Sequence, residues 1–109
     1  MKDWEINNEK KVSIGTTILD YNTFTVKTND EIIELPQKEF NILFKLFSYP
    51  NQIFIRTQLM NEFWGMLSES YERTIDVHIN RLRDKFKDNE DFEIVTVRGL
   101  GYKVVKKNG

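Results

Sequence analysis

The first third of the chain alternates short β-branched and aromatic runs with turn residues, a pattern typical of an antiparallel sheet. Gly15, Asn22 and the Thr28-Asn29-Asp30 triplet separate the runs. The runs themselves span residues 12–14, 17–21, 23–27 and 31–35. We therefore predict a meander of four strands. Residues 1–10 before it are polar and aperiodic, as in a tail or an interdomain linker.

The spacing of apolar positions changes from two to about 3.6 residues at residue 37, and this spacing predicts three helices. The first spans residues 37–49 and ends at Pro50, which cannot continue a helix. A shorter helix spans residues 56–63, and a third spans residues 73–87. The third helix carries one narrow apolar stripe, which we expect to face the core. The stripe consists of Ile75, Ile79, Leu82 and Phe86.

The chain closes with two further β-branched runs, residues 94–97 and 102–105, around the tetrapeptide Arg98-Gly99-Leu100-Gly101. Because Gly99 and Gly101 permit the positive φ angles of a tight turn, these runs predict a β-hairpin. The order of sheet, three helices and hairpin predicts an α+β fold rather than an α/β fold. The 109 residues suit a single domain, which we place at residues 11–107.

Composition excludes several classes of protein. The chain has no cysteine, so disulfides, thiolate metal sites and thiol catalysis are excluded. No run approaches the roughly 18 apolar residues of a membrane helix, so we expect a cytoplasmic protein. The net charge of −1 hides an asymmetry, because residues 73–109 carry 9 Lys or Arg and 6 Asp or Glu, whereas residues 1–72 carry 7 and 11. The C-terminal part is therefore the better candidate for contact with an anion.

The face of the third helix opposite the apolar stripe matches the chemistry of base-pair edges. It presents Arg73, Asp76, Val77, Asn80, Arg81 and Asp84. Arg81 can pair bidentately with guanine, and Asn80 can do the same with adenine. Asp76 can accept from the amino group of cytosine, and Val77 can pack on the methyl group of thymine. The alternative is that the arginines of this helix only keep it soluble.

The borders of that face and the hairpin support DNA binding further. His78 and Arg83 are placed to reach phosphates, which position a protein without specifying a sequence. Arg98, at the hairpin tip, can enter a narrow minor groove, where the potential is most negative. Helix and hairpin together predict sequence-specific binding to double-stranded DNA.

Two motifs, ERTIDVHINRLRDKF and IVTVRGLGYKV, resemble the C-terminal effector domain of OmpR/PhoB-type response regulators, and the resemblance continues upstream through ELPQKEFNILFKL and QLMNEFWG. It implies a winged helix-turn-helix that regulates transcription in a two-component phosphorelay. The recognition helix, residues 73–87, would enter the major groove, and the wing, residues 94–105, would lie at the minor groove. It also implies tandem binding to direct repeats, a receiver domain that this chain does not contain, and a histidine kinase that phosphorylates the receiver.

The resemblance also implies roles for individual residues. The phosphate-contacting set is Arg73, Thr74, His78, Arg83, Thr96 and Tyr102. The base-reading set is Asp76, Val77, Asn80 and Arg81, with Arg98 as the minor-groove arginine. In the family, the loop before the recognition helix touches RNA polymerase, usually a sigma subunit. The candidates for that contact are Trp64, Met66, Leu67, Glu69, Tyr71 and Glu72. For Tyr71 anchoring in the core is the alternative, and for Trp64 we favour it.

The chain departs from the family pattern at the starts of the first two helices and at Asn80. Pro36-Gln37 follows Leu35 where the family usually has Thr-Pro, and Ile55 stands where the family places Ser at the second helix. A missing cap costs about 1 kcal/mol, so we expect the first two helices to begin without side-chain caps. Asn80 replaces a frequent Arg or Lys, which predicts a different base preference.

An enzyme is the first alternative to DNA binding. The single histidine, His78, has no cysteine or clustered carboxylates with which to form a triad or a metal site, so we expect no enzyme, metal or cofactor. Glu90, Asp91 and Glu93 read as a solvated loop before a strand. A winged helix that binds only protein is the remaining alternative. A DNA-binding domain should bind random duplexes with an affinity that falls steeply as salt rises, whereas a domain that binds only protein should not bind them.

Overall fold

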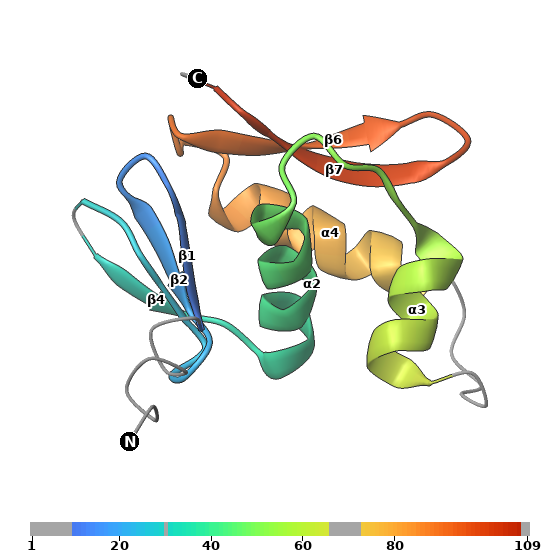
Figure 1. Cartoon of the computed structure of the whole chain (residues 1–109), viewed down its shortest axis with the longest axis horizontal. Coiled ribbons are helices and arrows are strands. Elements are labelled where there is room, and N and C mark those ends of the chain that lie inside the picture. The colour runs from blue at the N-terminus through green and yellow to red at the C-terminus, as the bar shows by residue number, and fades with distance from the viewer. Residues whose placement is uncertain (1–9, 30, 66–72, 108–109) are drawn as a thin grey trace.

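The computed structural model describes residues 10–29, 31–65 and 73–107, and it has the predicted α+β architecture. Two antiparallel sheets flank the three helices (Figure 1). The N-terminal sheet has the order β1-β2-β3-β4. Its strands are β1 (Lys11–Ile14), β2 (Thr17–Asp20), β3 (Thr25–Lys27) and β4 (Ile32–Glu34). The predicted meander is confirmed, with strand ends that differ from the prediction by one or two residues.

The first of the described helices joins the N-terminal sheet to the core. It is α2 (Gln37–Ser48), and Phe40, Leu43 and Leu46 on its inner face are fully buried. Tyr21 and Phe24, the first and last residues of the β2–β3 turn, meet the ring of Phe40 edge-on at centroid distances of 5.8 and 5.4 Å. Each fully buried side chain of this size stabilises the fold by about 1.5–3 kcal/mol. The sheet is therefore packed against α2 by aromatic contacts.

The other two helices are α3 (Arg56–Trp64) and α4 (Arg73–Lys85). The predicted apolar stripe of α4 is confirmed. Its members Ile75, Ile79, Leu82 and Phe86 are all buried. Phe86 lies just beyond the end of the helix, but its amide still donates to the carbonyl of Leu82. The N-cap residues of α2 and α3 are Pro36 and Ile55, and neither makes a side-chain capping hydrogen bond, as the departures from the family pattern led us to expect.

The C-terminal hairpin consists of β6 (Phe92–Val97) and β7 (Gly101–Lys106). It is longer than predicted, and β7 also pairs with β5 (Phe54–Ile55) on its other side. The resulting three-stranded sheet has the order β5-β7-β6. The sequence analysis missed β5 because two residues are too few to show a period.

The two glycines of the hairpin are required for different reasons. Gly99 has a φ of 77°, as a tight turn needs. The expected positive φ at Gly101 was wrong, because this residue lies within β7 and pairs with Ile55. A Cβ atom at Gly101 would lie 2.1 Å from the carbonyl oxygen of Phe54. Gly101 is therefore needed for the close approach of β5.

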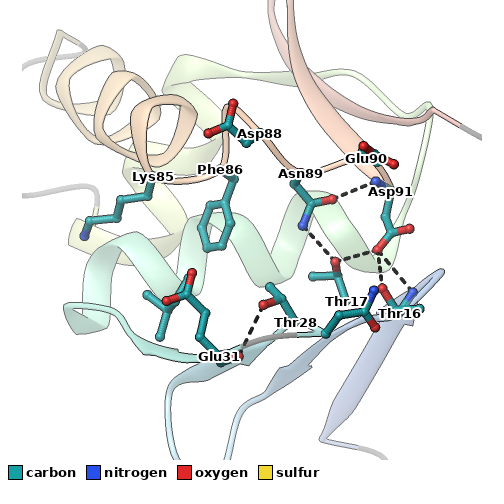
Figure 2. A pocket seen from close by; sticks show the side chains of 12 residues that line it. Thr16, Thr17, Thr28, Glu31, Lys85, Phe86, Asp88, Asn89, Glu90 and Asp91 are labelled. Atoms are coloured by element: carbon teal, nitrogen blue, oxygen red, sulfur yellow. Dashed lines mark hydrogen bonds between the residues drawn. The ribbon is translucent and has the colours of Figure 1, made fainter.

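The turn before β6 is not the solvated loop that the sequence suggested. Asp91 Oδ2 accepts hydrogen bonds from the amide of Thr16 at 3.1 Å and from the hydroxyls of Thr16 and Thr17 at 2.9 and 2.8 Å (Figure 2). The Asn89 side chain donates to Thr17 at 2.8 Å. The hydrogen bonds that Asp91 accepts hold its pKa below the usual value of 3.8, and the bond from the Thr17 hydroxyl is the largest cause. Asp91 thus fastens the β1–β2 turn to the segment between α4 and β6.

Substituting each hairpin glycine should show that Gly101 is required for space and that Gly99 is required for its left-handed backbone conformation. Gly101→Ala should lower the free energy of unfolding by about 1–3 kcal/mol or more, because its Cβ collides with the backbone of β5. Gly99→Ala should cost only about 1–2 kcal/mol, since space around it is open and only the left-handed conformation resists. Urea unfolding measures both, and an equal or smaller loss for Gly101→Ala would contradict the steric role.

Asp91 should contribute stability that depends on pH. Because its pKa is lower in the folded than in the unfolded chain, the contribution is present above pH 3.8 and is lost as pH falls through the folded pKa. Asp91→Asn should therefore cost about 1 kcal/mol near neutral pH, and the gap to the parent should close in acid. Asp88→Asn, at an exposed carboxylate of the same turn, is the control for urea unfolding across this range. A gap that stays constant with pH would overturn the assignment.

Candidate nucleic-acid interface

The outer face of α4 is a continuous exposed surface. Its exposed members are Arg73, Val77, Asn80, Arg81 and Asp84. Val77 is 44% exposed although it is apolar, and the opposite face of the helix is buried. The orientation of α4 that buries the stripe therefore also exposes a valine, an amide and two guanidinium groups together on the outer face. Thr74, at the border of this face, is half-buried.

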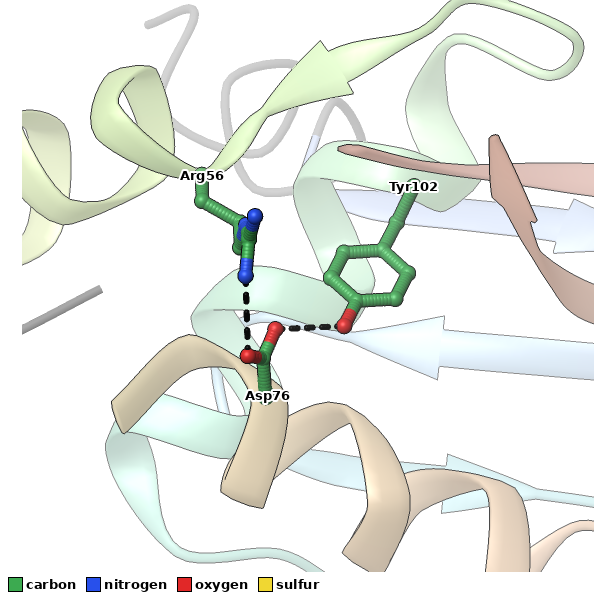
Figure 3. A network of polar contacts seen from close by, with 3 residues as sticks. All are labelled: Arg56, Asp76 and Tyr102. Atoms are coloured by element: carbon green, nitrogen blue, oxygen red, sulfur yellow. Dashed lines mark hydrogen bonds and ion pairs between the residues drawn. The ribbon is translucent and has the colours of Figure 1, made fainter. Parts of the chain in front are cut away.

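Asp76 differs from the rest of the predicted base-reading set, because both its carboxylate oxygens have partners within the chain. The Nη1 atom of Arg56 donates to Oδ2 at 3.0 Å, and the hydroxyl of Tyr102 donates to Oδ1 at 2.5 Å (Figure 3). Tyr102 is only 8% exposed, and its burial and the bond to Asp76 raise its pKa to about 12. The hydroxyl is therefore a proton donor at neutral pH. The sequence analysis gave Arg56 no role.

Three residues predicted to contact phosphates meet where α4 joins the hairpin. The Nε atom of Arg83 donates to the carbonyl of Ile94 at 3.1 Å, and its Nη2 atom donates to the hydroxyl of Thr96. The guanidinium also lies 5.4 Å from the ring centre of Tyr102. Arg83 is half-buried and Thr96 is exposed. Arg83 is therefore held in place by the hairpin.

A buried carboxylate lies under the exposed cations of α4. Glu39 of α2 is 2% exposed, and its oxygens lie 2.9 Å from Lys85 Nζ and 3.7 Å from Arg81 Nη1. Arg81 nevertheless keeps 61% of its side-chain surface exposed. Glu39 therefore compensates the charge of two cations while leaving Arg81 accessible. The sequence analysis missed it, because a glutamate beside an apolar helix face ordinarily remains in solvent.

His78 and Trp64 pack together at the other border of α4. Their ring centres are 5.4 Å apart, and Lys38 of α2 lies over the indole at 5.1 Å. Burial is the main cause that lowers the pKa of His78 below 6.5; Arg81 and Lys38 add to it, and Glu39 opposes it. The imidazole is therefore neutral at pH 7 and can donate a hydrogen bond but carries no charge.

The candidates for a polymerase contact fall mostly outside the described residues. Trp64 is partly buried and packs against the hydrophobic core, which agrees with the anchoring role favoured for it. The remaining candidates, all outside the described ranges, are Met66, Leu67, Glu69, Tyr71 and Glu72.

The tip of the hairpin is open to solvent. Arg98, Gly99 and Leu100 form the turn, all three are exposed, and Leu100 keeps 52% of its surface. Figure 1 shows this turn as a free end beyond the helices. Arg98 therefore has no part in the core and its side chain is open to solvent.

Within the same described ranges, no group of three or more His, Asp or Glu side chains could hold a metal ion. None of the helices in those ranges combines the length and apolar character needed to cross a membrane.

Comparison with known proteins places this chain in a family. Residues 29–104 match the family described as "Transcriptional regulatory protein, C terminal". The heme response regulator HssR of Staphylococcus aureus is 41% identical over 105 residues, which are 95% of this chain and 47% of that protein. The chain thus spans about half the length of this curated relative.

Solved structures agree in fold. The DNA-binding domain of RstA from Klebsiella pneumoniae, in complex with the RstA box, aligns with a TM-score of 0.75 at 32% identity, covering 88% of this chain and 97% of that one. The DNA-binding domain of CpxR from E. coli aligns with a TM-score of 0.76 at 27% identity, covering 89% and 97%. This chain belongs to the family of C-terminal transcriptional regulatory domains, the winged-helix effector domains of OmpR/PhoB-type response regulators.

Proposed function

We propose that this domain binds double-stranded DNA sequence-specifically and regulates transcription, with α4 in the major groove and the β6–β7 wing at the minor groove. The observation that carries the proposal is the exposed face of α4, which combines Val77, Asn80 and Arg81 beside a free Arg98 at the wing tip. The similar RstA domain was solved in complex with its DNA box, which supports the same activity here. Catalysis has no comparable support.

We assign each side chain a DNA contact from its position on α4 or on the wing. Val77, Asn80 and Arg81 read base edges, since they lie at the centre of the exposed face. Arg98 enters the minor groove. The phosphate contacts come from Arg73, Thr74, His78, Arg83 and Thr96, which lie at the ends and borders of that face or on the wing beside it. The hydroxyl of Tyr102, the sixth residue of the predicted set, donates to Asp76 and would reach a phosphate only if that bond broke. Within that group His78 acts as a neutral donor. Asp76 is a base reader only if DNA displaces one of its two partners.

Family membership supports a proposal about the partners of this domain. We propose that a receiver domain, phosphorylated by a histidine kinase, controls this effector domain in the cytoplasm. Two copies then bind tandem direct repeats about 10–10.5 bp apart, one helical turn of DNA. RNA polymerase, through a sigma subunit, contacts the segment between α3 and α4.

The proposed function is tested by selecting bound duplexes from a random pool and measuring affinity over a salt series. The affinity for specific and for random duplexes should fall steeply as the salt concentration rises, because Lys and Arg release counterions from the phosphates that they bind. On the selected duplex Arg81→Ala should cost about 1–3 kcal/mol and relax preference at one or two adjacent base pairs. Single-base variants of the duplex measure that preference.

Two further variants control this experiment. Arg81→Lys keeps the charge that faces Glu39 but loses the bidentate fork, so it should also relax the preference. Lys27→Ala removes an exposed cation of β3 on the N-terminal sheet and should leave affinity unchanged. If no duplex is enriched, the domain is a protein-binding winged helix. If Arg81→Ala keeps every preference, Arg81 is not a base reader.

Arg98 should contribute affinity without contributing stability. Arg98→Ala should change the free energy of unfolding by less than about 0.5 kcal/mol, because its side chain is exposed at the turn. It should weaken binding most on duplexes whose flank beside the wing is A·T-rich, where the minor groove narrows. Leu100→Ala, at the same turn, is the uncharged control. Equal losses on A·T-rich and G·C-rich flanks would leave Arg98 as a generic positive charge.

A further inference from the structure

α4 is tied to the wing by polar side chains at two levels. At its first turn, Asp76 accepts from Tyr102 of β7 at 2.5 Å. Seven residues later, Arg83 donates to the carbonyl of Ile94 at 3.1 Å and to Thr96, both on β6. Seven residues are about two helical turns, so the ties lie on the same face, roughly 10 Å apart along the axis. Packing of the apolar stripe sets the rotation of the helix, and two such points further restrict its rotation and tilt against the hairpin.

Tyr102 belongs to both ties. Its hydroxyl reaches Asp76, and the guanidinium of Arg83 lies over its ring at 5.4 Å. The ring is almost completely buried, so it has little freedom to follow a ligand. The same carboxylate of Asp76 accepts from Arg56 at 3.0 Å, which brings the start of α3 into the assembly (Figure 3). One carboxylate therefore connects α3, α4 and β7.

We propose that Asp76 and Tyr102 are positioning residues, which hold the recognition helix and the wing in one fixed arrangement so that major-groove and minor-groove contacts form together. The expected effect on DNA affinity rests on the proposed function, whereas the fixed arrangement of helix and wing does not. A rigid pair of elements loses less conformational entropy on binding, so the bond between Asp76 and Tyr102 raises affinity although neither side chain touches DNA. The pKa of Tyr102, about 12, keeps the donated proton in place at neutral pH.

The DNA-free test measures the arrangement itself. The sequence has no cysteine, so Asp84→Cys on α4 and Leu100→Cys on the wing can carry two spin labels for a distance measurement. Tyr102→Phe removes only the hydroxyl, and Asp76→Asn keeps the shape but can accept only through one oxygen. Both should broaden the distance distribution. Tyr49→Phe, at an exposed tyrosine after α2, is the control that should leave it unchanged.

The DNA test is a double-mutant cycle on the selected duplex. Tyr102→Phe and Asp76→Asn should each weaken binding by about tenfold. In either background the further loss from Arg98→Ala should fall below about twofold, because a wing that is no longer positioned contributes little. The double variant Asp76→Asn with Tyr102→Phe should be no weaker than the weaker single variant. Urea unfolding of each variant confirms that it is folded at the assay temperature.

The outcomes separate this proposal from the proposed function. Broadened distances together with a non-additive cycle support positioning. An unchanged distance distribution overturns it, and so does an additive cycle, which would make the Tyr102 hydroxyl a direct phosphate contact. If the unsubstituted domain selects no duplex, the proposed function fails, whereas the distance measurement still decides whether the ties hold the helix to the wing.

Discussion

Burial of the apolar stripe of α4 is the constraint on which the rest of the structure depends. Ile75, Ile79 and Leu82 are fully buried, and each contributes about 1.5–3 kcal/mol. A rotation of the helix by one residue, about 100°, would withdraw all three from the core and bury polar side chains such as Asn80 instead. The outward face is therefore fixed by packing, and its chemistry follows from which residues the stripe leaves outside.

The polar residues of α4 then divide by their distance from the stripe. Those at its borders, such as Asp76 and Arg83, find partners on neighbouring elements and serve the fold as well as the surface. Those at the centre of the outer face, Asn80 among them, remain exposed. Arg81 is intermediate, since it is exposed but lies 3.7 Å from buried Glu39. Residue type alone does not distinguish these groups, because the same helix supplies an arginine at a border and another on the outer face.

The sequence predicted what local spacing encodes, namely the meander, the three helices, the hairpin and the stripe of α4. It did not predict interactions between distant residues, which leave no local period. Asp91 and Thr16 are 75 positions apart, Lys85 and Glu39 are 46 apart, and Tyr102 and Asp76 are 26 apart. For the same reason β5 and the steric requirement at Gly101 were missed. The exposed face of the site was predictable, whereas the internal partners of Asp76 were not.

These distant interactions form a closed set around the recognition helix. β5 leads directly into α3 and pairs with β7, while Arg56 at the start of α3 reaches Asp76, and Asp76 reaches Tyr102 on β7. Helices α3 and α4 and strand β7 are thus joined pairwise, with β5 as the link between α3 and β7. Any one of the three can move only if both of its links change. The backbone pairing of β5 with β7 does not depend on Asp76 at all, because it requires only the small residue Gly101. Loss of the carboxylate should therefore leave the three elements associated but less well oriented, which separates the requirement for folding from the requirement for recognition.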